Sequence, residues 1–265
     1  MAKYSVPALE KAIAILDLIA SSEKHYTITE IHKTLDISKA TVFTILNVLE
    51  AHDIVKKNDK GEYEIGVKLY QLGMSYISKV DIVKIARPYL EALMEETGYT
   101  VHLGVLDSGE LLYVDKVEPD AFIKFSTFPG MRSEIHITSL GKAISAFLDE
   151  AELDKIISEK GLSKHTPHTM TDAQEFKQSL VEIRKNGYAI EDEEGEIGVR
   201  CIGAPIFSND GRRVVAAVSV ASHTSRLQPD SFGDVAKKVK NTAKAISKEL
   251  GFVGGNHRIV PMKIE

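Results

Sequence analysis

Two helix-start signals close together near the N-terminus constrain this chain most. Thr27-Ile28-Thr29-Glu30 is a capping box, in which the Thr27 hydroxyl and the Glu30 carboxylate each satisfy a backbone amide that lacks a partner inside the helix. This helix is expected to end near Leu35, because Asp36-Ile37-Ser38 is typical of a turn with Ser38 as the next N-cap. The sequence therefore predicts two helices joined by a tight turn.

A further helix and a hairpin complete the pattern of the first 80 residues. The helix after the turn ends near His52-Asp53, and its predicted buried face is Val42, Ile45, Leu46 and Leu49. A preceding helix spans residues 7–20, with Pro7 in its first turn. Its predicted buried face is Leu9, Ile13, Leu16 and Ala20. Residues 54–57 and 62–65 are extended candidates joined by the turn Asn58-Asp59-Lys60-Gly61.

This order of elements is typical of a winged helix-turn-helix, whose second helix enters the major groove of DNA. The hairpin would be the wing, beside the groove and against the phosphates. An ordinary helical hairpin shares the apolar spacing and remains an alternative at this stage. His32 stands where a small residue is usual, and Asp36 where glycine is common in the turn.

The predicted buried face of this helix, Val42, Ile45, Leu46 and Leu49, is called the Val42 stripe below. The opposite face of the helix supplies candidate DNA contacts. Lysine can donate to guanine, asparagine can pair with adenine, and an apolar side chain can touch a thymine methyl. Wing lysines would contact phosphates, which position the protein without specifying a sequence. The alternatives are a solvated hairpin for these lysines and a core position for Phe43. The predicted DNA-contact set is Ser38, Lys39, Ala40, Thr41, Phe43, Thr44, Asn47, Lys56, Lys57 and Lys60.

Charge limits how tightly one copy of this segment can bind DNA. Residues 1–80 contain ten lysines, ten acidic side chains and no arginine, so the overall charge of -5 belongs to the remainder of the chain. Because electrostatic affinity for DNA grows with the number of phosphates neutralised, a single neutral copy is expected to bind weakly. Two or more copies are therefore expected to act together.

The pattern changes after a linker. Asp81 can cap a helix that contains Pro88 and ends at Gly98, and from Val101 onward short strands alternate with helices. The expected strands are residues 101–106, 111–117, 121–125, 201–207 and 214–220, and the expected helices are 139–148, 150–158, 172–186 and 232–250, with a capping box at Thr171-Asp172-Ala173-Gln174. This is an α+β arrangement. We expect domains at 1–80 and 81–251, and a flexible tail at 252–265.

Several sequence strings, in order along nearly the whole chain, resemble the IclR family of bacterial transcriptional regulators. They are Ser38-Lys39-Ala40-Thr41-Val42, Glu96-Thr97-Gly98, Val101-His102-Leu103, Gly130-Met131-Arg132, the run from His136 to Ala143, Gly187-Tyr188-Ala189, Gly198-Val199-Arg200-Cys201 and Ala204-Pro205-Ile206-Phe207. The resemblance implies an α+β fold with an N-terminal winged helix-turn-helix, a linker helix and a C-terminal GAF-like α/β effector-binding domain. It also implies a double-stranded DNA operator and assembly as a homodimer or a dimer of dimers. Many members have arginine where this chain has Thr44.

The resemblance also implies a pocket for a small-molecule effector. Its predicted residues are Phe122, Phe125, Ser139, Leu140, Gly141, Glu191, Cys201, Ser219 and Ala221. A helix that opens at Ser139-Leu140-Gly141 offers unpaired amides, so a carboxylate is the expected ligand chemistry, such as an organic or sugar acid. Family members often have serine where Ala221 stands. The alternative is that Phe122, Phe125 and Ser219 only pack within the sheet.

An enzyme with an accessory helical domain is the leading alternative function. It would depend on Cys201 or on a metal, yet a buried thiol is inert far more often than nucleophilic. His102, His136 and His223 lack helical metal-ligand spacing, and the acidic run Glu191 to Glu196 is typical of a solvated loop. We expect no metal and no cofactor. One cysteine and the lack of a long apolar run favour a cytoplasmic protein without a membrane anchor.

Overall fold

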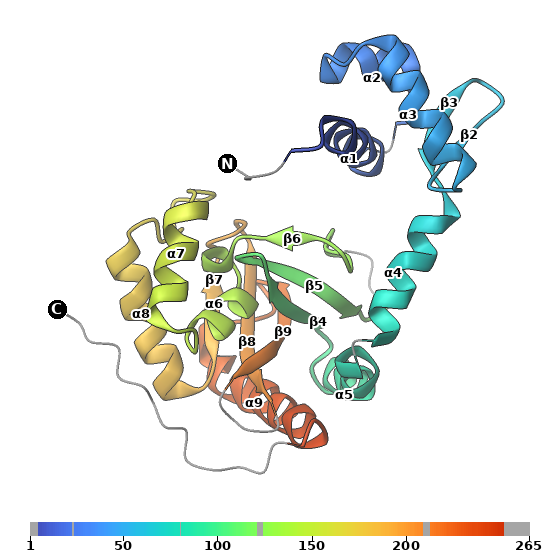
Figure 1. The fold of residues 1–265 in the computed structure, drawn as a ribbon. Helices are drawn as coiled ribbons and strands as arrows, with labels where there is room; N and C mark the ends of the chain where they lie inside the picture. Colours follow the sequence, from blue (N-terminus) through green and yellow to red (C-terminus); the bar gives the residue numbers. More distant parts are fainter. Residues whose placement is uncertain (1–4, 23, 80, 121–123, 209–212, 252–265) are drawn as a thin grey trace. The chain divides into compact units, whose positions relative to one another are not determined.

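The computed structural model describes residues 5–22, 24–79, 81–120, 124–208 and 213–251. The chain divides into two compact units, Met1–Val80 and Asp81–Glu265. Figure 1 labels the elements of both units. The predicted tail at 252–265 lies outside the described residues.

The first unit is a small helical domain with a three-stranded antiparallel sheet. Its elements are α1 (Pro7–Ala20), β1 (Tyr26–Thr27), α2 (Ile28–Leu35), α3 (Lys39–Ala51), β2 (Val55–Lys57), β3 (Glu62–Ile65) and α4 (Val67–Lys79). The strand order is β1-β3-β2, so the predicted hairpin gains a short third strand, β1, for which the sequence carries no clear signal. Helices α1, α2 and α3 and strands β2 and β3 enclose one apolar core.

Local signals set the ends of α2 and α3. The Glu30 carboxylate accepts the Thr27 amide at 2.9 Å, and the Thr27 hydroxyl accepts the Glu30 amide at 3.4 Å, which confirms the predicted capping box. Asp36 ends α2 in the left-handed conformation at φ 52°, which aspartate tolerates better than most residues. Ser38 then caps α3 by accepting the Thr41 amide, as predicted.

Helix α1 buries a different face from the predicted one. Ile15 and Ile19 lie in the core, whereas Leu9 and Ile13 are 58% and 50% exposed. Apolar residues occur around most of the circumference of α1, so their spacing is compatible with more than one buried face. The predicted face that included Leu9 and Ile13 is therefore wrong.

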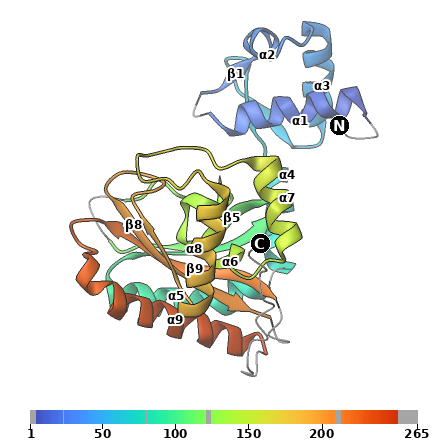
Figure 2. The same cartoon turned by 90° about the vertical axis from the view of Figure 1, so that its left-hand side faces the viewer.

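The second unit is a six-stranded antiparallel sheet with helices on both faces. Its strands are β4 (Thr100–Asp107), β5 (Glu110–Val117), β6 (Arg132–Ser133), β7 (Ala189–Asp192), β8 (Val199–Phe207) and β9 (Val214–His223). Its helices are α5 (Asp81–Thr97), η1 (Ile135–Ile137), α6 (Ser139–Ser145), α7 (Glu150–Lys160), α8 (Ala173–Asn186), η2 (Pro229–Ser231) and α9 (Phe232–Glu249). The strand order is β6-β5-β4-β9-β8-β7. Figures 1 and 2 show α5 and α9 together on the face opposite α6.

Three predictions for this unit need correction. The helix predicted at residues 172–186 begins with Asp172 as its N-cap, because the Asp172 carboxylate accepts the amides of Gln174 and Glu175 at 2.9 and 2.8 Å. Thr171 is therefore not the cap. Within the strand predicted at 121–125, residues 121–123 lie outside the described residues, and Lys124 and Phe125 are irregular. The helix predicted at 139–148 ends at Ser145.

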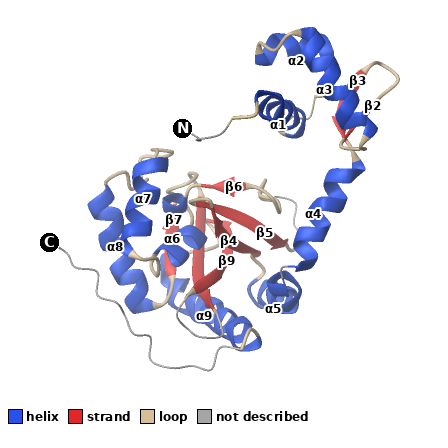
Figure 3. Ribbon diagram, in the orientation of Figure 1, coloured by secondary structure: helices blue, strands red, loops and turns tan. Residues whose placement is uncertain are grey.

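Two short strands at opposite edges of the sheet were not predicted. β6 pairs with β5, and β7 pairs with β8; Figure 3 shows β6 and β7 among the red strands. Strands of two and four residues carry little periodic signal, because so short a segment shows at most two alternations of buried and exposed side chains. β7 matters most, because it brings the start of the acidic run into the sheet.

Candidate functional site

The outward face of α3 is the first candidate site. Lys39, Ala40, Phe43, Thr44 and Asn47 are all exposed, while the Val42 stripe is buried as predicted. Phe43 is 52% exposed, so it does not belong to the core. A helix with one buried stripe and an exposed face after a tight turn has the shape that the major groove admits.

The β2–β3 hairpin carries the three predicted wing lysines. Lys56, Lys57 and Lys60 are exposed, and the Lys57 ammonium lies 5.7 Å from the centre of the Tyr63 ring. The turn is fixed by Asn58, whose side-chain oxygen accepts the amides of Lys60 and Glu62, each at 3.0 Å. Lys60 therefore projects from a well-defined turn, and Lys56 and Lys57 project from the adjacent strand β2, where their exposed side chains can reach phosphates.

The second candidate site is a cavity of about 460 Å³ in the second unit. Strand register explains which side chains line it. Glu191 on β7 lies opposite Cys201 on β8, and Cys201 lies opposite Ala221 on β9. Two residues along β9, Ser219 lies opposite His102 of β4. These side chains share one face of the sheet because strand residues two apart point the same way.

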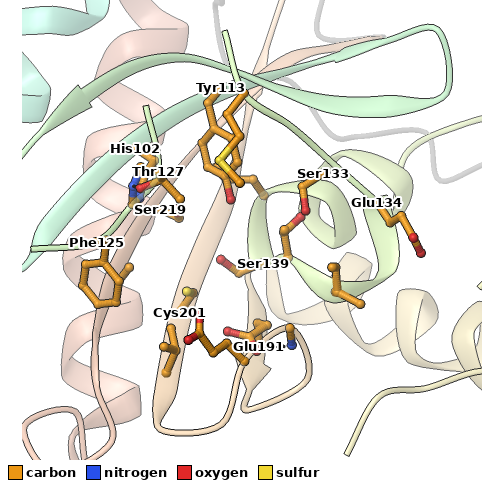
Figure 4. A pocket seen from close by; sticks show the side chains of 18 of the residues that line it. His102, Tyr113, Phe125, Thr127, Ser133, Glu134, Ser139, Glu191, Cys201 and Ser219 are labelled. Atoms are coloured by element: carbon orange, nitrogen blue, oxygen red, sulfur yellow. Dashed lines mark hydrogen bonds between the residues drawn. The ribbon is translucent and has the colours of Figure 1, made fainter. Parts of the chain in front are cut away.

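The start of α6 packs against this face of the sheet and forms another wall of the cavity. A Cβ on Gly203 of β8 would lie 2.8 Å from the Ser139 carbonyl, so only glycine lets α6 approach the sheet this closely. Ser139 and Leu140 consequently line the cavity. The Ser139 hydroxyl is buried and has no hydrogen-bond partner among the described residues, and Figure 4 shows it directed into the cavity. A buried hydroxyl in this state is set to bond a ligand or a water.

The structure brings most of the predicted effector residues together. Phe125, Ser139, Leu140, Glu191, Cys201, Ser219 and Ala221 all line the cavity. Phe122 lies outside the described residues. Gly141 does not line it, and its amide donates to the Thr138 hydroxyl at 3.0 Å. The prediction that Gly141 offers a free amide to a carboxylate is therefore wrong, because the helix supplies its own cap.

Sequence reasoning missed several residues of the cavity. His102, Tyr113 and Thr127 line it, and His102 Nε2 lies 2.7 Å from the Thr127 hydroxyl. The sequence places His102 in one of the family strings and offers it as a possible metal ligand, but not as a residue of the effector pocket. The usable signal was its pairing with Ser219, which becomes visible only when strands β4 and β9 are placed side by side.

Burial determines the protonation state of two titratable side chains that line the cavity, Glu191 and His102. Burial raises the pKa of Glu191 to about 7, although the amides of Gly195 and Glu194 and the Cys201 thiol stabilise the charged form. Burial lowers the pKa of His102 to about 3, so this imidazole is neutral at physiological pH. The cavity thus contains a carboxyl that can carry a proton near neutral pH.

The acidic run is partly buried, which corrects its interpretation as a solvated loop. Glu191 and Glu194 are 2% and 7% exposed. The Lys142 ammonium, itself buried in α6, pairs with Glu194 and donates to the Ile190 carbonyl at 3.3 Å. A buried ion pair therefore lies behind the cavity and holds the β7–β8 connection against α6.

Catalytic and metal chemistry find little support. Burial, followed by the neighbouring Glu191 charge, raises the pKa of the Cys201 thiol well above its usual value, which disfavours the thiolate that a nucleophile requires. In the ranges that the structure describes, no group of three or more His, Cys, Asp or Glu side chains could hold a metal ion. No helix there is long and apolar enough to cross a membrane.

Two family models match this chain. Residues 8–59 match the IclR helix-turn-helix domain, and residues 74–248 match the bacterial transcriptional regulator IclR C-terminal domain. The chain is 33% identical over 249 residues to the HTH-type transcriptional regulator XynR of Escherichia coli, covering 93% of this chain and 98% of XynR. It is 32% identical over 252 residues to the HTH-type transcriptional repressor AllR of Escherichia coli, covering 95% and 93% of the two chains.

Solved structures agree with these sequence matches. The Thermotoga maritima IclR structure is 34% identical, with a TM-score of 0.77 over 92% of this chain and 98% of that one. An IclR regulator from Alicyclobacillus acidocaldarius is 26% identical, with a TM-score of 0.80 over 94% and 100%. The predicted fold class is confirmed, and the relatives are named as regulators, which argues against the enzyme alternative. The chain belongs to the IclR family of bacterial transcriptional regulators, with a helix-turn-helix DNA-binding domain and an effector-binding domain.

Proposed function

We propose that this protein is a metabolite-responsive repressor whose operator binding changes when a small organic or sugar acid occupies the 460 Å³ cavity. The observation that carries the proposal is the buried Ser139 hydroxyl, which faces this space and has no hydrogen-bond partner in the described part of the chain. Repression is supported by the relative AllR, which is named a repressor. A bacterial operator lies in the cytoplasm, so we place the protein there.

The cavity favours an acid that is bound by neutral donors. Arg132 lines the cavity, but its guanidinium pairs with Asp107 and lies 3.8 Å from Glu110. A ligand carboxylate can instead accept from the Ser139 hydroxyl and from protonated Glu191. Apolar walls from Phe125 and Leu140 would cover the rest of a small molecule.

The DNA contacts that we propose are those of α3 and the wing. The exposed α3 side chains would enter the major groove, while Lys56, Lys57 and Lys60 would contact phosphates. Ser38 and Thr41 lie at the start of α3, where they would face the DNA phosphates at the edge of the major groove.

Assembly of at least two copies follows from charge and from exposed apolar surface. The first 80 residues carry no net charge, so paired copies are needed for firm DNA binding. Val6, Leu9 and Ile13 of the α1 region are each at least half exposed, which is unusual for three apolar side chains so close in sequence. We propose a homodimer or a dimer of dimers, with residues 1–80 as the DNA-binding domain and 81–251 as the linker helix and effector domain.

A thermal-shift screen of small carboxylates and sugar acids on the full chain would identify a ligand, because a molecule that binds only the folded state raises apparent stability. Operator affinity is then measured with and without that ligand. In Phe125→Glu, the ligand should no longer change operator affinity, while binding of ligand-free protein to DNA is retained.

The matched control is Phe128→Glu, because Phe128 is 58% exposed and does not line the cavity. This variant should respond to the ligand as the unaltered protein does. A normal ligand response in Phe125→Glu would mean that the effector binds elsewhere.

A further inference from the structure

The direction in which each α3 side chain points follows from the buried stripe. Val42, Ile45, Leu46 and Leu49 define the inward direction. Since each residue turns the helix by about 100°, Ala40, Thr44, Asn47 and Ala51 lie within roughly 30° of the opposite direction. These four exposed residues are the centre of the outward face.

Flanking this centre are two large apolar side chains. Phe43 and Val48 are 52% and 55% exposed, and they lie about 70° to either side of the outward direction. Lys39, by contrast, lies about 110° from that direction, at the edge of the helix. A lysine at this edge is placed for the phosphate backbone beside the groove.

The Thr44 hydroxyl is already bonded within α3, whereas Ser38 and Thr41, at the start of the helix, share one hydrogen bond and keep one hydroxyl proton between them. The Thr44 hydroxyl donates to the Ala40 carbonyl at 2.9 Å, which leaves the Thr44 methyl as its outward group. The Ser38 and Thr41 hydroxyls lie 2.8 Å apart and bond to each other, and the Ser38 oxygen also accepts the Thr41 amide. At the centre of the outward face, Asn47 is therefore the side chain that retains hydrogen-bond donors.

The four base pairs present different chemistry to such a surface. Guanine shows two acceptors in the major groove, and arginine or lysine donors read it most often. Adenine shows one donor and one acceptor, which match the asparagine amide, and thymine shows a methyl group that apolar side chains contact. Residues 1–80 contain no arginine.

We propose that α3 reads adenine–thymine base pairs, with Asn47 on adenine and the apolar group Ala40, Phe43 and the Thr44 methyl on thymine methyls. This inference rests on the proposed role of α3 in the major groove and adds the class of sequence that it selects. Lys39 contacts a phosphate, so it contributes affinity without base preference.

The test uses the full chain and begins with selection of bound sequences from a pool of random duplex DNA. We expect A·T pairs at the positions that α3 contacts. In a selected duplex, each thymine is then replaced by uracil, which lacks only the methyl group. Loss of one methyl contact should weaken binding about fourfold, in line with about 0.8 kcal/mol for one buried apolar carbon.

Paired variants show which side chain reads which base. Phe43→Ala should bind thymine and uracil duplexes equally at the position that Phe43 contacts, since the partner of the methyl has been removed. Asn47→Ala should lose between about fivefold and about 150-fold of its preference for adenine at one position. It should also become insensitive to 7-deazaadenine, which lacks the N7 acceptor. Both side chains are exposed, and circular dichroism confirms folding of each variant.

The control is Lys57→Ala in the wing, which should weaken binding to all duplexes by a similar factor and keep the full uracil effect. Selected sites that have G·C pairs at the contacted positions, with a preference that Lys39→Ala abolishes, would overturn the inference but leave specific DNA binding intact. Uracil duplexes that bind as well as thymine duplexes would also overturn it. A pool in which no sequence is enriched would overturn both this inference and the proposed function.

Discussion

Replacing Glu191 with glutamine should stabilise the protein at alkaline pH and change it little in acid. Burial raises the pKa of Glu191 from 4.5 to about 7 in the folded chain, and this effect is absent in the unfolded chain. A tenfold change in proton affinity is worth about 1.4 kcal/mol, so ionising the buried carboxyl costs about 3 kcal/mol of folding free energy. That cost is absent below pH 4.5, grows as pH rises, and is complete above pH 7.

Glutamine is a close match for the protonated carboxyl. The Glu191 Oε1 atom accepts the amides of Glu194 and Gly195 at 2.7 and 3.0 Å, and the glutamine oxygen can accept both. Relative to the unaltered protein, Glu191→Gln should therefore be about 3 kcal/mol more stable at pH 8 and less than about 1 kcal/mol more stable at pH 5. The measurement is urea unfolding of the full chain at both pH values, followed by circular dichroism.

Glu196→Gln is the matched control, because it removes a carboxylate of the same acidic run from an exposed position. Because this position is exposed, the substitution should change the free energy of unfolding by less than about 0.5 kcal/mol at either pH. If Glu191→Gln changed the free energy of unfolding equally at pH 5 and pH 8, burial would not be holding the carboxyl protonated. The proposal that protonated Glu191 donates a hydrogen bond to the ligand would then fail.

Three further substitutions test other parts of the structure. Thr27→Ala removes the cap of α2 and should cost about 1 kcal/mol in urea unfolding, whereas Thr34→Ala, at an exposed position of the same helix, should cost nothing. Gly203→Ala should lower the melting temperature and abolish ligand binding, because the new alanine Cβ would clash with the Ser139 carbonyl. Gly73→Ala should have neither effect, because a Cβ at that position has no atom within 4 Å. Lys142→Met should cost about 3–5 kcal/mol by leaving Glu194 unpaired, and the further change Glu194→Leu should restore most of that loss; no recovery would contradict a direct pair.

The sequence predicts best those features that close within a few residues. The capping box of Thr27 and Glu30 and the Ser38 cap are satisfied by their own helix, so their residue types alone are informative. The predicted buried face of α1 was wrong because it is not determined within the helix. It depends on which side of the helix the core contacts, and Leu9 and Ile15 are equally apolar.

The cavity required information from distant strands. Resemblance to a family supplied Ser139, Glu191 and Cys201, but His102 enters the site because β4 pairs with β9 in a register that sets it beside Ser219. No local pattern in β4 separates a histidine that faces a cavity from one that packs in a core. The prediction that Gly141 binds the effector was wrong because its amide already donates to the Thr138 hydroxyl. That contact depends on which residue caps α6.

The acidic run shows why local patterns mislead at a binding site. A stretch of carboxylates favours solvent, and only a cation in the protein interior could draw Glu194 inward. That cation is Lys142, which lies 52 residues earlier in a helix whose other residues are mostly apolar or small. Neither a buried Lys142 nor a buried Glu194 is expected from its neighbours in the sequence. The burial of each is explained by the other, which it contacts only in the folded unit. Their pairing sets the β7–β8 connection against α6 and so presents Glu191 to the cavity, which is consistent with polar exceptions gathering where a protein binds its ligand.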